Sequence, residues 1–180
     1  GCLFYDKKQY ETAKDHWLTS VSEDPEFAMA HRNLAIAYYN KEKDMEKALV
    51  SMKRALDLDP GYSRFLLEYD QLCSKAGVSN EDRLDLLEER VELAEDRDAL
   101  YVEYITLLNN TCQYDKALSC LGSHRFHPWE GGEGKVSTQY RYALTQKAIQ
   151  LLDEKKYDEA IQLLEQTKVY PENLGEGKLP

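Results

Sequence analysis

Four side chains able to bind a metal or transfer a proton recur at every third position late in the chain, namely His124, His127, Glu130 and Glu133. Imidazole and carboxylate groups are common zinc ligands and common general acids and bases. Residues at this spacing face the same way only on a helix, and Pro128 with the glycines after it interrupts a regular helix through all four. The spacing also leaves the distance between the two carboxylates undefined. We therefore expect no catalytic residue, no metal and no other cofactor here.

The surrounding segment, FHPWEGGEGKVS at residues 126–137, invites comparison with a phosphate-binding loop. Such a loop has a glycine, four further residues, and then Gly-Lys followed by serine or threonine. Trp129 occupies the position of the first glycine, and Val136 occupies the position of the hydroxyl residue. The two glutamates would in addition repel a phosphate group. The segment therefore disfavours nucleotide binding.

A related segment, VYPENLGEGKLP, lies near the end of the chain at residues 169–180. When the prolines of the two segments are aligned, both glycines of the GEG triplet and the residues around them coincide. The matching pairs are Pro128 with Pro171, Gly132 with Gly175, Glu133 with Glu176, Gly134 with Gly177, and Lys135 with Lys178. Each segment follows a stretch of helical pattern, so the glycine-rich sequence is a repeated feature of the chain.

Two interpretations of these glycine-rich segments are open and compatible. In the first, both are rigid elbows, because proline ends a helix, glycine allows a positive φ, and Trp129 can cover the end of the preceding helix pair. In the second, both project from one edge of the molecule and contact a partner or ligand. The contact residues would then be Trp129, Glu130, Glu133, Lys135, Glu176 and Lys178.

The helices that precede these segments are themselves repeated. YDKKQYETAKDHWLTSVSEDP and YNKEKDMEKALVSMKRALDLDP share a polar turn, an alanine, a large apolar residue four positions later, and a final proline. Two later stretches keep the alanine and the apolar residue. The four pairs are Ala13 with Trp17, Ala48 with Met52, Ala117 with Leu121, and Ala160 with Leu164. No alternating strand pattern is present, so the sequence predicts an all-α chain built from helical hairpins.

This pattern resembles the tetratricopeptide repeat (TPR), in which about 34 residues form two antiparallel helices. Residues 33–60 are its clearest example. The resemblance implies a right-handed α–α superhelix, a TPR solenoid of about five repeats that forms one domain over residues 1–180. The expected repeats are 1–25 with a truncated first helix, 26–60 with one extra residue in its turn, 61–97, 98–136 including the glycine-rich insertion, and 137–180.

The third expected repeat is degenerate, since its second helix, residues 80–96, lacks the alanine signature that the other second helices share. The first expected repeat begins part-way through a helical pattern, and Gly1 is not an initiator residue. We therefore expect the chain to be a piece of a longer protein.

Composition and net charge exclude some classes of partner. The formal net charge is −10 and the sequence pI is about 4.9, so neither nucleic acid nor an anionic membrane is an expected partner. The mean hydropathy is −0.67, and no apolar run approaches the length of a membrane span. The four cysteines have no CxxC spacing, which favours free thiols in a reducing compartment and a cytoplasmic location.

In a TPR array the leading helices line a concave groove that commonly holds a protein segment. In this register, the expected groove residues are Arg32, Tyr39, Tyr62, Phe65, Tyr69 and Tyr142. Aromatic rings with few rotamers suit a recognition surface. The resemblance therefore implies a non-catalytic scaffold for interactions between proteins or domains. Its partner would be a protein or peptide segment, or the protein's own upstream domain.

One well-known use of this fold is excluded by the residues present. Chaperone-binding repeats hold a C-terminal carboxylate with lysine, asparagine and arginine at fixed positions. Asn33 matches the central asparagine, but Cys2 replaces a second asparagine, and Tyr62 and Leu66 replace the two cations. A buried carboxylate would have no compensating charge, so we expect no carboxylate clamp.

A narrower resemblance rests on RFHPWEGGEGKVS and PENLGEGKL. These stretches are similar to the C-terminal TPR region of large bacterial proteins whose N-terminal part is a galactose-mutarotase-like β-sandwich of uncharacterised function. The resemblance implies a carbohydrate-linked parent protein. The alternative function is therefore an accessory region of a carbohydrate-active enzyme, in which the glycine-rich segments line part of a sugar-binding cleft. No catalytic residue of such an enzyme falls within these 180 residues.

Overall fold

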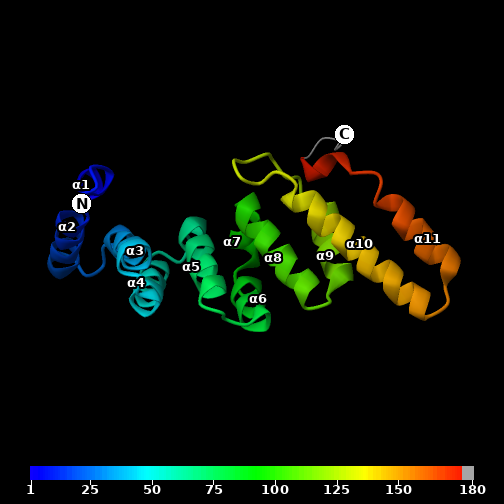
Figure 1. Ribbon diagram of the computed structural model, residues 1–180, viewed down its shortest axis with the longest axis horizontal. Coiled ribbons are helices and arrows are strands. Elements are labelled where there is room, and N and C mark those ends of the chain that lie inside the picture. The colour runs from blue at the N-terminus through cyan, green and yellow to red at the C-terminus, as the bar shows by residue number, and fades with distance from the viewer. Residues whose placement is uncertain (176–180) are drawn as a thin grey trace. The chain divides into compact units, whose positions relative to one another are not determined.

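The computed structural model describes residues 1–175, and over these residues the chain is helical, without a strand (Figure 1). The helices follow one another as hairpins, which confirms the predicted all-α solenoid class. The chain divides into two compact units, Gly1–Ser79 and Asn80–Pro180, and each is described by itself. The division falls between the two helices expected for the third repeat.

The first unit is a series of packed helices. Its elements are α1 (Cys2–Asp6), α2 (Tyr10–Glu23), α3 (Ala28–Ala37), the π-helical turn η1 (Tyr38–Glu42), α4 (Met45–Leu58) and α5 (Ser63–Lys75). Ala13 and Ala48 are fully buried, as the repeat pattern predicts, and Trp17 and Met52 are buried beside them. Because alanine has no side chain beyond Cβ, neighbouring helices approach closely there while the larger residues fill the space between them.

The extra residue predicted in the turn of the second repeat lies in the π-helical turn. In this turn the helical hydrogen bonds widen by one residue at the end of α3, which accommodates an insertion. Lys43 then adopts a left-handed conformation with φ of 57°, and Asp44 begins α4 by accepting a hydrogen bond from the Lys47 N–H at 2.9 Å. The turn carries Tyr39 and Asn40.

The second unit is centred on a strongly buried helix. Its elements are α6 (Asn80–Glu88), α7 (Val91–Glu95), α8 (Asp98–Asn110), α9 (Tyr114–Ser123), α10 (Lys135–Asp153), α11 (Tyr157–Gln166) and a 3₁₀ turn, η2 (Glu172–Leu174). Helix α8 buries eight of its 13 residues, among them Tyr101 and Tyr104, and it packs against α6, α7, α9 and α10. Ala117 and Ala160 are fully buried, as predicted.

The prediction of one continuous helix over residues 80–96 is wrong, because the structure divides it into α6 and α7. At Arg90 φ is −134°, and the Arg90 N–H bonds to the Leu87 carbonyl at 3.1 Å instead of continuing the α-helical pattern. Two buried tyrosines of α8 hold the two pieces. Tyr104 donates to Glu88 on α6, and Tyr101 donates to Glu95 on α7. Local helical periodicity does not predict long-range contacts of this kind.

Three further properties concern only residues 1–175. All four cysteines are free, and Cys73 is buried. No helix in this range combines the length and the apolar character that crossing a bilayer requires. No group of three or more histidine, cysteine, aspartate or glutamate side chains there is arranged to hold a metal ion.

Candidate functional site

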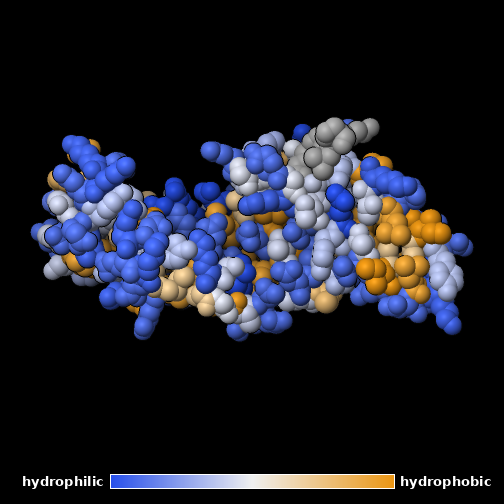
Figure 2. Space-filling model, viewed as in Figure 1, coloured by the Kyte–Doolittle hydropathy of each residue, from blue (hydrophilic) through white to orange (hydrophobic). Residues whose placement is uncertain are grey.

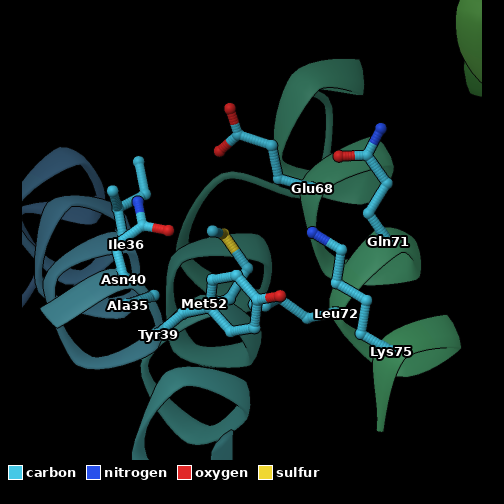
Figure 3. Close-up of a pocket in the computed structure, with 9 residues that line it drawn as sticks. All are labelled: Ala35, Ile36, Tyr39, Asn40, Met52, Glu68, Gln71, Leu72 and Lys75. Carbon is cyan, nitrogen blue, oxygen red and sulfur yellow. The ribbon is translucent and has the colours of Figure 1, made fainter. Parts of the chain in front are cut away.

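A cavity of about 260 Å³ opens in the first unit beside α3, the π-helical turn and α5 (Figure 3). Met52 of α4 and Leu72 of α5 form its buried apolar floor. Polar and amphipathic side chains surround this floor. The full lining is Ala35, Ile36, Tyr39, Asn40, Met52, Glu68, Gln71, Leu72 and Lys75, which we call the α3–α5 pocket.

Helical spacing explains how the side chains converge. Glu68, Gln71, Leu72 and Lys75 are separated by three or four residues, so they share one face of α5. On the opposite side, Tyr39 lies about one turn after Ala35. Figure 3 shows the Tyr39 ring beside Met52 and Leu72, with the Lys75 side chain extending toward it. The Lys75 ammonium lies 4.6 Å from the ring centroid, within the range of a cation–π contact.

The glutamate of the pocket is held by two arginines. Arg32 Nε and Nη2 donate to the two carboxylate oxygens of Glu68, each at 2.6 Å, and Arg64 Nε donates to Glu68 Oε1 at 2.9 Å. Partial burial opposes ionisation of Glu68, but the hydrogen bonds from the two arginines outweigh it and lower the pKa of its carboxyl group. Two arginines therefore pair with one carboxylate, and Lys75 is a further cation that lines the pocket.

The six predicted groove residues have different surroundings in the structure. Tyr39 lines the α3–α5 pocket, and Arg32 supports it through Glu68. Tyr69 is half-buried against the cluster of Ala35, Ala48, Met52 and Leu72, and burial raises the pKa of its hydroxyl group to about 12. Tyr142 belongs to α10 of the second unit and is an exposed residue.

The expectation that Phe65 contacts a partner is wrong. Its side chain is only 1% exposed, and its ring packs edge-on against Tyr62 at a centroid distance of 4.8 Å. Phe65 is therefore a core residue that positions half-buried Tyr62. An aromatic residue at a leading-helix position faces either the groove or the neighbouring helix, and local spacing does not distinguish these two cases.

The sequence analysis did not name four polar residues of the pocket, Asn40, Glu68, Gln71 and Lys75. Three of them, Glu68, Gln71 and Lys75, lie at helical spacing on one face of α5, so this spacing offered a signal. Asn40 depends on the π-helical turn, which rotates it relative to an ordinary helix, and no spacing rule would have placed it.

The glycine-rich segments of the second unit meet each other. Asn173 Nδ2 donates to the carbonyl oxygens of Leu121 and His124 at 2.7 and 2.8 Å, and the Phe126 N–H donates to the Asn173 carbonyl at 2.8 Å. The later segment therefore satisfies carbonyls at the C-terminal end of α9, which would otherwise lack intrahelical partners.

A carboxylate on α8 anchors the earlier segment. Asp98 Oδ1 lies 2.7 Å from His124 Nε2, and Asp98 Oδ2 accepts a hydrogen bond from the His127 N–H at 2.7 Å. We call Asp98, His124 and His127 the Asp98 cluster. Burial opposes ionisation of Asp98, but the hydrogen bonds from the two histidines outweigh it and lower the pKa of this carboxyl group.

Two glycines allow close contacts that a larger residue would block. A Cβ atom on Gly132 would overlap the Trp129 ring, and a Cβ atom on Gly175 would overlap the Phe126 carbonyl. Gly175 also has a positive φ of 70°. These contacts support the elbow interpretation. Trp129 is half-buried, whereas Glu130, Glu133 and Lys135 are exposed; the predicted contact residues Glu176 and Lys178 lie outside the described range.

No protein-family model matches the chain. Two human proteins, RANBP2-like and GRIP domain-containing proteins 1 and 2, are each 32% identical to it over 78 residues. This match covers 43% of the chain but only 4% of the length of either protein.

Solved structures match over far more of the chain. YrrB, described as a TPR protein with an unusual peptide-binding site, has a TM-score of 0.61 at 18% identity, over 92% of this chain and 79% of its own. MamA has a TM-score of 0.60 at 14% identity, over 93% of this chain and 85% of its own. PilF of Pseudomonas aeruginosa has a TM-score of 0.54 at 19% identity, over 97% and 76%. The chain therefore has the fold of tetratricopeptide-repeat proteins.

Proposed function

We propose that the chain is a non-catalytic protein-interaction module whose α3–α5 pocket binds an extended peptide segment of a partner. The pocket supports this function through its combination of an apolar floor, Met52 and Leu72, with carboxamide groups at its edge, Asn40 and Gln71. Carboxamides both donate and accept hydrogen bonds, so they suit the alternating N–H and C=O groups of a peptide backbone. The apolar floor suits one side chain of that peptide.

The size of the pocket favours a peptide side chain over a small-molecule substrate. Pockets for drug-sized ligands typically occupy about 300 to 1,000 Å³. The α3–α5 pocket, at about 260 Å³, is below that range and open to solvent. The peptide-binding site named for YrrB belongs to that protein, and it provides an independent reason to test this chain with peptides.

Charge defines the partner segment more narrowly. Arg32 and Arg64 pair with Glu68, and Lys75 lines the pocket beside Tyr39, so these four charged side chains comprise three cations and one carboxylate. We expect the bound segment to carry a large apolar residue flanked by aspartate or glutamate. Its source is either another protein or an upstream part of the same polypeptide. The exposed residues Glu130, Glu133 and Lys135 form a separate proposed contact, and their charge reversal should leave peptide binding in the pocket unchanged.

The test is selection of a displayed library of random ten-residue peptides on the 180-residue chain, followed by fluorescence anisotropy with the enriched peptides. We expect enrichment of an apolar residue next to acidic residues. Tyr39→Ala and Lys75→Glu should each weaken binding about tenfold or more, because they remove an aromatic contact and reverse a charge. Arg54→Glu, an equal charge change at an exposed position of α4, is the matched control. The proposal would be contradicted if no peptide is enriched on the unchanged chain. It would also be contradicted if the enriched peptides bind Tyr39→Ala and Lys75→Glu as well as the unchanged chain.

A further inference from the structure

Helices α9 and α11 have matching sequences but opposite exposure. Both begin with Tyr-Asp and have alanine at the fourth position and leucine at the eighth. Tyr114 and Leu121 of α9 are 7% and 0% exposed, whereas the equivalent Tyr157 and Leu164 of α11 are 57% and 39% exposed. The same apolar positions are thus covered in one helix and open in the other, as far as residues 1–175 show.

The open positions form part of a larger apolar surface. Figure 2 shows hydrophobic residues gathered over the region of α10 and α11. Its exposed members are Ile149, Leu152, Tyr157, Ile161 and Leu164, which we call the α10–α11 face. A contiguous apolar surface of this kind marks a site of interaction.

The molecule itself contains the kind of element that covers such a face. Helix α10 packs on α9, where Tyr142 lies edge-on to Tyr114 at a centroid distance of 6.4 Å, and Lys147 forms an ion pair with Asp115. Helix α10 is basic, because it carries two lysines and one arginine and has no acidic residue before Asp153. A helix with three basic residues thus packs on α9 and pairs one of them, Lys147, with Asp115.

Helix α11 offers the same chemistry to a partner. Asp158 is the counterpart of Asp115, and α11 also carries Glu159 and Glu165 but no lysine or arginine. A second copy of this chain is a poor match, because its net charge of −10 would place like charges together. An apolar stripe flanked by lysine or arginine complements the exposed apolar residues and the acidic residues of the face.

We propose that the α10–α11 face binds a basic amphipathic helix of a partner, in the way that α10 covers α9. Tyr157, Ile161 and Leu164 contact its apolar stripe, and Asp158 pairs with a lysine or arginine, as Asp115 pairs with Lys147. This surface lies in the second unit, so the proposal does not depend on peptide binding in the α3–α5 pocket.

The test uses a defined probe, a fluorescein-labelled synthetic peptide with the sequence of residues 135–153, added to the 180-residue chain and followed by fluorescence anisotropy. We expect saturable binding that weakens about tenfold or more in Leu164→Asp. Asp158→Lys should weaken binding severalfold, and a peptide carrying Lys147→Glu should restore it, because the ion pair is then formed with the charges exchanged. Val50→Asp, at a 67% exposed residue of α4, is the matched control and should bind as the unchanged chain does.

Three results would overturn the proposal. The first is the absence of saturable binding to the unchanged chain and to its variants, although circular dichroism shows that these proteins are folded. The second is equal binding of a peptide in which Lys135, Arg141 and Lys147 are replaced by glutamate. The third is self-association of the chain that Leu164→Asp abolishes in sedimentation velocity, because a second copy would then be the occupant of the face.

Discussion

The two units each contain a half-buried carboxylate with a lowered pKa, yet the surroundings give these groups different roles. Glu68 of the first unit accepts hydrogen bonds from Arg32 and Arg64 and lines an open cavity. Asp98 of the second unit accepts from the His127 backbone and pairs with the His124 ring, beside a glycine-rich segment. The comparison teaches that a shifted pKa does not by itself identify a binding site. A carboxylate that orders a loop also accepts hydrogen bonds in its ionised form, and these lower its pKa in the same way.

The largest expected effect is the loss of stability caused by Asp98→Ala. The substitution removes the acceptor of two charge-assisted hydrogen bonds, so the free energy of unfolding should fall by about 3 kcal/mol. Peptide binding in the α3–α5 pocket should remain unchanged at a temperature where the variant is folded. Urea unfolding measures the first quantity, with Asp96→Ala at an exposed neighbouring position as the control. If the free energy of unfolding falls by less than about 0.5 kcal/mol, as expected for a surface substitution, the Asp98 cluster does not stabilise the fold.

The next effect concerns the packing of the glycine-rich segment. Gly132→Ala should lower the free energy of unfolding by about 2 kcal/mol, because the new methyl group overlaps the Trp129 ring. Gly122→Ala, in helix α9 with open space around it, should instead raise stability by roughly 0.5 to 1 kcal/mol.

Thermal or urea unfolding of both variants tests this pair. The cost of Gly132→Ala should shrink in a Trp129→Ala background, where the overlap is absent. An equal cost in both backgrounds would show that the ring does not determine the need for glycine at this position.

The smallest effect concerns Glu68. Arg32→Ala removes the bidentate partner of this carboxylate, so the free energy of unfolding at neutral pH should fall by roughly 1 to 2 kcal/mol. The contribution of Glu68 in the unchanged chain is complete above its ordinary pKa of 4.5 and is lost as the pH falls through the lowered value. Stability should therefore decline in acid, and Arg32→Ala should show a shallower decline.

Urea unfolding at a series of pH values from neutral to acid measures this difference, with Arg54→Ala as the control at an exposed position. Arg32→Ala should also weaken peptide binding, unlike Asp98→Ala. An identical acid profile for Arg32→Ala and the unchanged chain would show that the arginine does not lower the pKa of Glu68, and would weaken the comparison between the two carboxylates.

Much of the fold was predictable because its rules are local. The alanine and the large apolar residue four positions later lie on one side of a helix, so Ala13 and Trp17, or Ala48 and Met52, identify helices that pack closely. An extra residue was expected in the turn of the second repeat, and the π-helical turn lies there, but local spacing did not predict its π-helical form. The break at Arg90 was missed, since it depends on Tyr101 and Tyr104 of another helix.

The candidate site was predictable only in part. Tyr39 and Phe65 were both expected in the groove, but Tyr39 lines the α3–α5 pocket whereas Phe65 is buried, and local spacing did not distinguish them. Arg32 was expected to contact a partner, whereas its nearest charge is Glu68, 36 residues away. Long-range pairs of this kind determine which side chains remain free to bind, and one sequence without its fold does not reveal them.

The sequence by itself determined the all-α class and the buried alanine positions, because helical periodicity acts over a few residues. Only the tertiary structure decided that Glu68 lines a cavity while Asp98 anchors a loop. It also decided that Tyr157 is exposed while its counterpart Tyr114 is covered. The physical reason is that exposure depends on what packs against a residue, and this is a property of the neighbouring helix and not of the residue's own segment.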